Sequence, residues 1–339
     1  MKQEFSTLSE YKNFLNNLPS FNKEAKKRAI DYNSKLTKPQ GSLGILEDLA
    51  LFFAGWQGIE IPKLEKIQIA IFAGNHGIIE QDVSAFPSEV TSQMVTNFKN
   101  GGAAINQLSL LFGAELNVYA MDLDRPTKNF TVEPALTEEE CLKAIMTGWN
   151  SVDSDSHLFL AGEMGIGNTT SAAAIAAALC GGDGISWVGR GTGISNEALD
   201  RKIDVVNKGL KRHVTLGASP LQILQRLGGR EIAAIVGAIT AARYHRIPFL
   251  LDGFICGAAA LVLEKTLSGS LDHVISGHVS AEYAHKKMLD ELRKKPLISL
   301  NLRLGEGSGA AVAIGIIKSA IACHSGMASF NSAGVSNKD

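Results

Sequence analysis

The chain has 339 residues, of which 45% are hydrophobic and 20% are charged. This length and composition allow a large hydrophobic core and exclude a mostly disordered chain. The formal net charge is −1, and acidic and basic residues are spread along the sequence. This pattern excludes the basic surface by which proteins usually bind nucleic acids, so we expect a protein that acts on small molecules.

The sequence carries no pattern typical of export or membrane insertion. Residues 1–11 are polar and lack the apolar stretch of a secretory signal. The longest uncharged apolar stretch, about 254–263, is shorter than the ~18 residues that cross a bilayer. We expect a cytoplasmic protein with no membrane partner. The cysteines form no CxxC pair, and we interpret them as small core residues: Cys141, Cys180, Cys256 and Cys323.

Predicted strands and helices alternate after a helical N-terminal segment. Residues 6–33 show no strand pattern, and Pro19 divides them into two short helices. Alanine-rich segments predict helices at 170–179 and 231–244, and 308–324 predicts a long final helix. Short apolar runs rich in β-branched residues predict strands at 67–73, 116–121, 157–161, 185–188, 247–251 and 271–275.

This alternation predicts an α/β fold with a Rossmann-like, mainly parallel sheet and helices on both faces. Helices from the two ends of the chain are expected to pair beside the sheet. We therefore predict a large α/β catalytic domain over residues 34–307 and a small helical domain formed by 1–33 and 308–339. Ligands of open parallel sheets bind outside the carboxyl ends of the strands. Glycine-rich segments follow the predicted strands there, at 74–77, 162–170, 189–193 and 252–253.

Two of these glycine-rich segments resemble anion-binding loops. The turn at 162–170 opens a helix, whose N-terminus suits a phosphate or carboxylate, but it is no Walker A loop because no Lys-Ser/Thr follows. The alternative is a tight turn with Asn168 or Thr169 as the helix cap. Residues 189–193 read GxGxG and not the GxGxxG of dinucleotide-binding proteins. This loop is either a second phosphate contact with Arg190 or an ordinary turn.

Glu306 is the sharpest local feature of the sequence. It stands between two glycines directly before the apolar helix that begins near 308. The glycines would let backbone or substrate approach the carboxylate closely, and burial would raise its pKa while the helix N-terminus would oppose that rise. The alternative is an acid that simply caps the helix. His76, His278 and His285 lie on separate segments without metal-ligand spacing, so we predict no metal site.

Several motifs occur in order along the chain: KPQGSLG at 38–44, 74–77, SAFPSEVT at 84–91, 162–170, 189–193, DGF at 252–254, 302–309 and AGVSNK at 333–338. Taken together and in this order, they resemble the motifs of the nicotinate-nucleotide–dimethylbenzimidazole phosphoribosyltransferase family. The likeness runs from about residue 35 to the end of the chain. It implies a homodimer, a six-stranded parallel sheet and a small helical domain built from both chain ends.

The resemblance also implies roles for individual residues. The catalytic carboxylate corresponds to Glu306, and a second carboxylate near the ribose and base corresponds to Glu163. The residues expected to contact the base are Phe86, Met94 and Met164, which would form an apolar, adaptable pocket. Asn75 stands where many relatives have Asp, which would alter a local hydrogen bond. Other substrate contacts are implied at Gly165, Gly167, Asn168, Thr169, Gly191, Asp252, Gly253, Ser280, Arg303, Leu304 and Gly305.

The reaction implied by the resemblance is a pentosyl transfer that needs no cofactor. The phosphoribosyl group of nicotinate mononucleotide would pass to 5,6-dimethylbenzimidazole or a related base, for the nucleotide loop of cobalamin. Glu306 would take the ring N–H proton of the incoming base, and Glu163 would stabilise positive charge on the ribose. Two alternatives stay open, a nicotinate-nucleotide hydrolase and a non-catalytic nucleotide sensor. The preferred base is not specified by the sequence.

Overall fold

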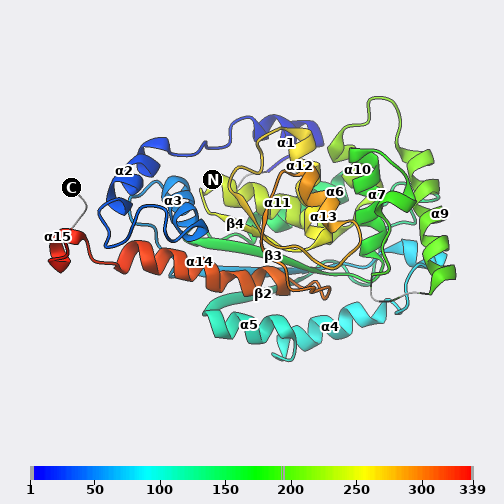
Figure 1. Ribbon diagram of the computed structural model, residues 1–339. Helices are drawn as coiled ribbons and strands as arrows, with labels where there is room; N and C mark the ends of the chain where they lie inside the picture. Colours follow the sequence, from blue (N-terminus) through cyan, green and yellow to red (C-terminus); the bar gives the residue numbers. More distant parts are fainter. Residues whose placement is uncertain (1–3, 192, 194, 337–339) are drawn as a thin grey trace.

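The computed structural model describes residues 4–191, 193 and 195–336. Thr192 in the glycine-rich loop and Asn337 and Lys338 in the C-terminal motif lie outside this range. Within the described chain, one sheet of six parallel strands has the order β2-β1-β3-β4-β5-β6 (Figure 1). The strands are β1 (Ile67–Ala73), β2 (Ala114–Ala120), β3 (Leu158–Met164), β4 (Phe249–Leu251), β5 (Val274–His278) and β6 (Pro296–Ile298).

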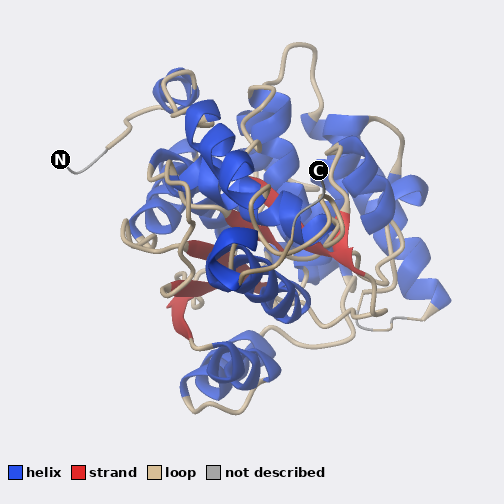
Figure 2. Cartoon of the chain, turned by 60° about the vertical axis from the view of Figure 1, so that its left-hand side comes forward, coloured by secondary structure: helices blue, strands red, loops and turns tan. Residues whose placement is uncertain are grey.

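Alternate side chains of the strands enter two hydrophobic clusters, one on each face of the sheet. In β1, Ala70 and Phe72 join the larger cluster, whereas Ile69 and Ile71 join the smaller one. Since both faces of β1 are buried, its run of apolar residues is nearly continuous, as expected for a parallel strand. The Rossmann-like α/β fold with helices on both faces is thereby confirmed (Figure 2).

The larger cluster is covered by helices between α1 and α13, and the smaller one mainly by α14. Figure 1 shows α11 and α12 above the strands and α4 and α5 below them. Helices contributing to the larger cluster are α1 (Leu8–Leu15), α6 (Glu138–Asn150), α7 (Asn168–Cys180), α8 (Gly184–Trp187), α9 (Asn196–His213), α10 (Pro220–Leu227), α11 (Arg230–Tyr244), α12 (Phe254–Thr266) and α13 (His285–Glu291). Those contributing to the smaller one are α3 (Ile45–Gln57), α4 (Glu89–Lys99), α5 (Ala104–Phe112) and α14 (Ser308–Gly326).

The two ends of the chain meet beside α3. The backbone nitrogen of Thr37 donates to the oxygen of Ala328 at 2.9 Å, and that of Phe330 donates to Lys35 at 3.0 Å. The helices near this junction are α2 (Lys23–Asn33), which packs on α3, and α15 (Phe330–Ala333). By contrast α1 packs against α11, where the Tyr11 hydroxyl lies 2.6 Å from Thr240 Oγ1. The domain boundaries given above stay a prediction.

Two short segments differ in kind from the sequence prediction, and β3 and β5 each end three residues later than predicted. Residues 185–188, predicted as a strand, belong mostly to helix α8, because Asp183 caps that helix by accepting from the Ser186 nitrogen. The run is too short for periodicity to distinguish the two structures. Strand β6 was missed because it has only three residues, begins with proline and lies half-buried at the edge of the sheet. A short 3₁₀ helix, η1 (Gly77–Gln81), follows β1.

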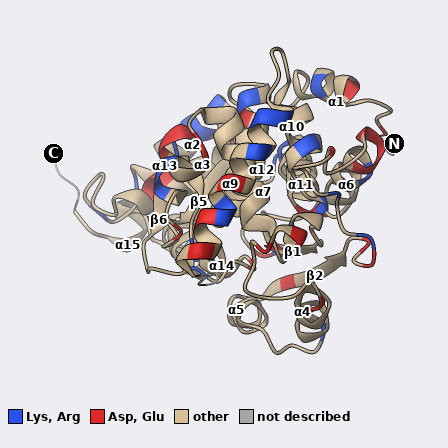
Figure 3. Cartoon of the chain, turned by 90° about the vertical axis from the view of Figure 1, so that its right-hand side faces the viewer, with Lys and Arg blue, Asp and Glu red and all other residues tan. Residues whose placement is uncertain are grey.

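Helix α14 is apolar and long enough to cross a membrane, but it belongs to the core. Ala310, Ala313, Ile314 and Ile317 are fully buried, and the helix packs on α3, α5 and β5. Among the described helices it alone meets those criteria of length and hydropathy. Acidic and basic residues intermingle on the outer helices, as Figure 3 shows for α9 and α13. No basic face stands out in that view.

Candidate functional site

A cavity of about 120 Å³ lies at the carboxyl ends of β3, β4 and β5. The chain leaves β1 toward β2 on one side, whereas β3 lies on the other side of β1, so the strand order reverses beside β3. Ligands of open parallel sheets bind at such a reversal. The cavity is lined by Glu163, Met164, Gly165, Ile166, Asn168, Thr169, Gly191, Asp252, Gly253, Phe254, Ile255, His278, Ser280, Glu282, Arg303, Leu304, Gly305 and Glu306.

The fold brings most of the predicted site residues together around this cavity. Three are not in its wall: Gly167, Phe86 and Met94. Gly167 lies in the turn between β3 and α7, Phe86 is 46% exposed, and Met94 packs partly buried against the smaller hydrophobic cluster. The segment that carries Phe86 and Met94 nevertheless reaches the site, since Thr91 Oγ1 accepts a hydrogen bond from the Ile166 nitrogen at 3.2 Å.

Several residues of the site were not predicted. Ile166, Phe254, Ile255, His278 and Glu282 line the cavity beside the expected residues. Directly behind the wall, Lys202 Nζ donates to Thr169 Oγ1 at 2.8 Å and to the oxygen of Gly189 at 3.3 Å. Burial lowers the pKa of Lys202 to about 8. Its position within the charged helix α9 is typical of a surface residue, so no local signal marks it.

The turn between β3 and α7 presents the helix N-terminus to the cavity. Gly167 is the N-cap with a φ of 95°, a left-handed conformation that favours glycine, and no side chain caps the helix. The alternative in which Asn168 or Thr169 caps the helix is therefore wrong. The Asn168 amide instead donates a short hydrogen bond to Glu163 Oε2. The turn therefore orients the Glu163 carboxyl as well as shaping the wall.

Glu163, at the end of β3, and Glu306, directly before α14, are buried carboxyl groups in the wall of the cavity. Each is 6% exposed. Burial and, to a smaller extent, the Asp252 carboxylate raise the pKa of Glu163 to about 8 and that of Glu306 to about 7. Burial alone would also raise the pKa of Asp252, but the His278 ring and the Ala310 N–H bring it below its ordinary value. The site thus holds two carboxyl groups that exchange protons near neutral pH.

Two other polar clusters lie near the same edge of the sheet. His76 Nδ1 lies 3.0 Å from Ser171 Oγ and its Nε2 lies 2.6 Å from Glu231 Oε1, an order that resembles a hydrolytic triad. All three side chains are fully buried, so Ser171 cannot reach a substrate. Asn75 Nδ2 donates to the oxygen of Leu123 at 3.0 Å, a bond that an ionised aspartate could not make.

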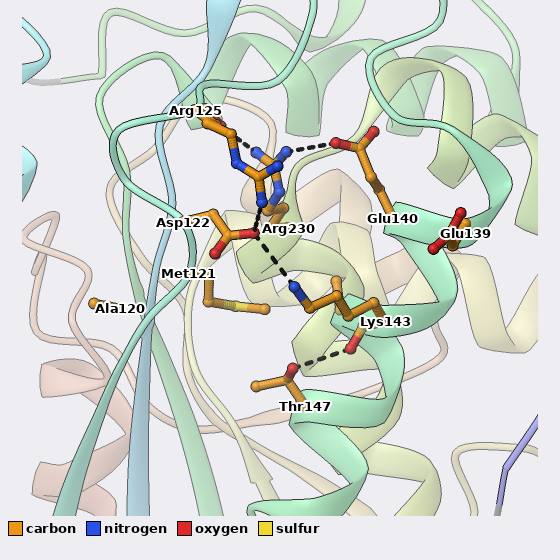
Figure 4. A pocket seen from close by; sticks show the side chains of 10 residues that line it. Ala120, Met121, Asp122, Arg125, Glu139, Glu140, Lys143, Thr147 and Arg230 are labelled. Atoms are coloured by element: carbon orange, nitrogen blue, oxygen red, sulfur yellow. Dashed lines mark hydrogen bonds and ion pairs between the residues drawn. The ribbon is translucent and has the colours of Figure 1, made fainter.

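A larger cavity of about 500 Å³ lies beyond the end of β2, between that strand and α6 (Figure 4). Most of its charged side chains pair with one another, among them Arg230 with Glu140 at 2.8 Å and Arg125 with Asp122 at 2.8 Å. Hydrogen bonding to Arg125 keeps the pKa of Asp122 low. A carboxylate held in its ionised form by arginine is a poor proton acceptor near pH 7, so this cavity lacks the acid–base groups of the first one. No cluster of His, Cys, Asp or Glu among the described residues could hold a metal ion.

Comparison with known proteins places this site in a family. A family model described as a phosphoribosyltransferase matches residues 18–335. The nicotinate-nucleotide–dimethylbenzimidazole phosphoribosyltransferase of Cereibacter sphaeroides (strain KD131) is 54% identical over 99% of both chains. That of Ruegeria pomeroyi is 53% identical over 99% of this chain and 100% of its own. The crystal structure of CobT from Thermus thermophilus superimposes with a TM-score of 0.87 and 38% identity, covering 93% of this chain and 100% of that one. The chain belongs to the nicotinate-nucleotide–dimethylbenzimidazole phosphoribosyltransferase family.

Proposed function

We propose that this enzyme transfers the phosphoribosyl group of nicotinate mononucleotide to 5,6-dimethylbenzimidazole or a related aromatic base. The products are nicotinate and α-ribazole 5′-phosphate, which supplies the nucleotide loop of cobalamin. One observation carries the proposal: Glu306, a buried carboxyl group with a pKa of about 7, faces the cavity at the reversal of strand order. A group with this pKa accepts a proton efficiently near neutral pH.

The chemistry of the two substrates requires one base. Nicotinate leaves C1′ of the ribose as its pyridinium becomes a neutral ring, so the leaving group needs no proton. The incoming benzimidazole bonds to C1′ through one nitrogen and loses the proton on its other nitrogen. Glu306 takes this proton, and attack opposite nicotinate converts the β-riboside into an α-riboside. Alignment of the two rings supplies much of the remaining acceleration.

Glu163 is the proposed electrostatic partner of the ribose. Its raised pKa comes mainly from burial. A cationic pyridinium bound in the cavity would favour the ionised form of Glu163, since an opposite charge lowers the pKa of a carboxyl group. The ionised carboxylate then stabilises positive charge that develops at C1′ during transfer.

The phosphate and ribose are assigned to the glycine-rich turns. The N-terminus of α7 supplies backbone N–H groups to an anion, and Lys202 adds a positive charge directly behind Thr169. Asp252 is the exception among the proposed contacts, because backbone nitrogens already occupy its carboxylate oxygens. The remaining proposed contacts are Gly165, Gly167, Asn168, Thr169, Gly191, Gly253, Ser280, Arg303 and Gly305.

The aromatic base is assigned to the apolar side of the cavity. Met164 and Leu304 belong to its wall, together with Phe254 and Ile255. Phe86 and Met94 are proposed to meet the part of the base that extends outside. The cavity volume of about 120 Å³ is below the ~300 Å³ of a typical small-molecule site, so both substrates cannot be enclosed by the described residues alone.

We also propose that the enzyme is a homodimer. Two large apolar side chains on α5, Leu110 and Leu111, are 76% and 72% exposed. Exposed apolar patches of this kind are typical of protein interfaces. We also propose a cytoplasmic location, as the composition suggested, and no nucleic-acid partner.

The test is to incubate the enzyme with nicotinate mononucleotide and, in turn, 5,6-dimethylbenzimidazole, benzimidazole, adenine and phenol. Mass detection of each α-riboside phosphate, with nicotinate released in equal amount, would establish both the reaction and the range of bases. Nicotinate release without any added base would favour the hydrolase instead. Tight nucleotide binding without turnover for every base would favour the sensor.

A further inference from the structure

We infer that Asp252 and His278 are positioning residues, which cap the first turn of α14 and thereby hold the carboxyl group of Glu306 in the cavity. This inference rests on the proposed role of Glu306 as the base. It assigns to Asp252 a task inside the protein in place of the substrate contact implied by family resemblance.

The backbone at Glu306 has an unusual left-handed conformation. Gly305, Glu306 and Gly307 have φ values of 82°, 60° and 73°, so three successive residues adopt a left-handed conformation. Glycine tolerates this region, but for Glu306 it is unfavourable. Such a conformation persists only where the surrounding structure imposes it. The backbone therefore needs a restraint, and the direction of the Glu306 side chain depends on that restraint.

Asp252 supplies this restraint on the backbone at Glu306. Helix α14 has Gly307 as its N-cap, which offers no side chain to the first-turn N–H groups. Asp252, from the end of β4, replaces the missing cap: Oδ2 accepts from the Gly307 nitrogen at 3.2 Å and Oδ1 accepts from the Ala310 nitrogen at 2.9 Å. A carboxylate at a helix N-terminus also gains from the helix dipole. Asp252 is 1% exposed, so water does not compete for these bonds.

A buried histidine lies next to the Asp252 carboxylate. His278, the last residue of β5, places Nε2 3.2 Å from Asp252 Oδ1. Its ring lies directly on the first turn of α14, where a Cβ at Gly309 would lie 2.2 Å from His278 Cε1. Glycine at 309 is therefore required by the ring. Behind it lies His285, whose Nδ1 accepts from the Ser280 nitrogen at 2.8 Å and whose ring centroid is 5.9 Å from that of His278.

A positioning role and a substrate-binding role of Asp252 predict different changes in kcat and KM. A positioning residue changes how often Glu306 is aligned with the base, so its loss lowers kcat while the KM for nicotinate mononucleotide changes little. A residue that contacts the nucleotide equally before and during the reaction changes KM instead. Misplacement of a reacting group by about 1 Å costs up to about 100-fold in rate.

The experiment compares three variants with the wild type: Asp252→Asn, Gly309→Ala and Gly326→Ala. Gly309→Ala displaces the His278 ring without altering any charged group. Gly326→Ala is the matched control at the other end of α14, where nothing lies within 4 Å of an added Cβ. We expect Asp252→Asn and Gly309→Ala to lower kcat by roughly 10- to 100-fold with KM within about threefold, and Gly326→Ala to leave both unchanged. Circular dichroism and binding of nicotinate mononucleotide would verify that each variant is folded.

The pH dependence of kcat distinguishes the loss of the Asp252 charge from a general loss of packing. The Asp252 charge contributes to the raised pKa of Glu306, so the rising limb of kcat should move to lower pH in Asp252→Asn but not in Gly309→Ala. The other ionisable groups around this site are retained in both variants, and Gly309→Ala moves only the His278 ring among them: Glu163, His278, Glu282, His285 and Arg303.

Each outcome decides the inference. A large rise in KM at unchanged kcat for Asp252→Asn would show that Asp252 contacts the substrate. A Gly309→Ala rate equal to that of Gly326→Ala would show that His278 does not help to position Glu306. A crystal structure of Asp252→Asn with Glu306 in its original position would also overturn it. Glu306→Gln, measured alongside, separates the two proposals. If that variant keeps the wild-type rate, the base assignment fails and positioning fails with it; if it is inactive while Gly309→Ala and Asp252→Asn are normal, positioning alone fails.

Discussion

His76 Nε2 and Glu231 Oε1 lie 2.6 Å apart, and both side chains are fully buried between β1, α7 and α11. Removing one member of such a pair leaves an uncompensated polar group in the core, which costs about 3–5 kcal/mol. We expect Glu231→Ala to lower the free energy of unfolding by this amount in urea denaturation at pH 7. The control is Lys66→Ala, which breaks a pair with Asp153 that is about 40% exposed and should cost about 0–1 kcal/mol. Equal losses in the two variants would contradict this account.

Replacing Glu306 by glutamine tests the proposed base directly. Glutamine keeps the size of the side chain but cannot accept the ring N–H proton of the incoming base. We expect kcat to fall by roughly 10²- to 10⁴-fold, with nicotinate mononucleotide still bound and the protein still folded. Product formation by mass detection and thermal unfolding are the measurements. A folded variant with nearly the wild-type rate would exclude Glu306 as the base.

The pH dependence of the rate follows from the same group. Because burial raises the pKa of Glu306 to about 7, the base is mostly protonated below that pH. We expect kcat to rise with pH up to about 7 and to fall about tenfold per unit below it. A rate that stays constant down to pH 5 would show that no group with this pKa must be deprotonated in the enzyme–substrate complex.

Stability is expected to depend on pH in the opposite direction. The pKa of Glu163 is about 8 in the folded protein and 4.5 as its ordinary value. The neutral form is thus favoured by folding, and the stability it contributes is present at low pH and lost as the pH rises through about 8. Glu163→Gln removes this ionisation. We expect the variant to be more stable than the wild type at pH 9 by on the order of 1 kcal/mol or more, with a smaller difference at pH 6, as measured by urea denaturation.

Gly162 in β3 is expected to be irreplaceable because α14 begins directly against it. A Cβ at this position would lie 2.5 Å from the Gly307 nitrogen and 2.6 Å from the Glu306 carbonyl carbon. Backbone atoms cannot move aside as the end of a flexible side chain can. We expect Gly162→Ala to cost about 1–3 kcal/mol of stability or more and to lower kcat by displacing Glu306. Thermal unfolding and turnover are the measurements, and unchanged values for both would show that β3 and α14 can separate freely.

The overall fold could be predicted from the sequence because its pattern is local. Strand β1 has the predicted bounds, 67–73, and the helices at 170–179, 231–244 and 308–324 lie within α7, α11 and α14. The glycine-rich segment 162–170 spans the end of β3 and the start of α7, and 252–253 follows β4. Parallel strands bring their carboxyl ends to one edge of the sheet. The general place of the site is therefore a consequence of the order of elements along the chain.

The tertiary structure decided which groups distant in the sequence meet, and how strongly the pKa of each is shifted. Lys202 looks like a surface residue of a charged helix until the fold places it behind Thr169. The sequence predicted Asp252 as a substrate contact and His278 only as no metal ligand, yet β4 and β5 carry them to the first turn of α14. The raised pKa of Glu163 likewise depends on burial and on the carboxylate of Asp252, which is distant in sequence. Periodicity and turn chemistry act over a few residues, whereas desolvation and charge pairing depend on distances that only the folded chain defines.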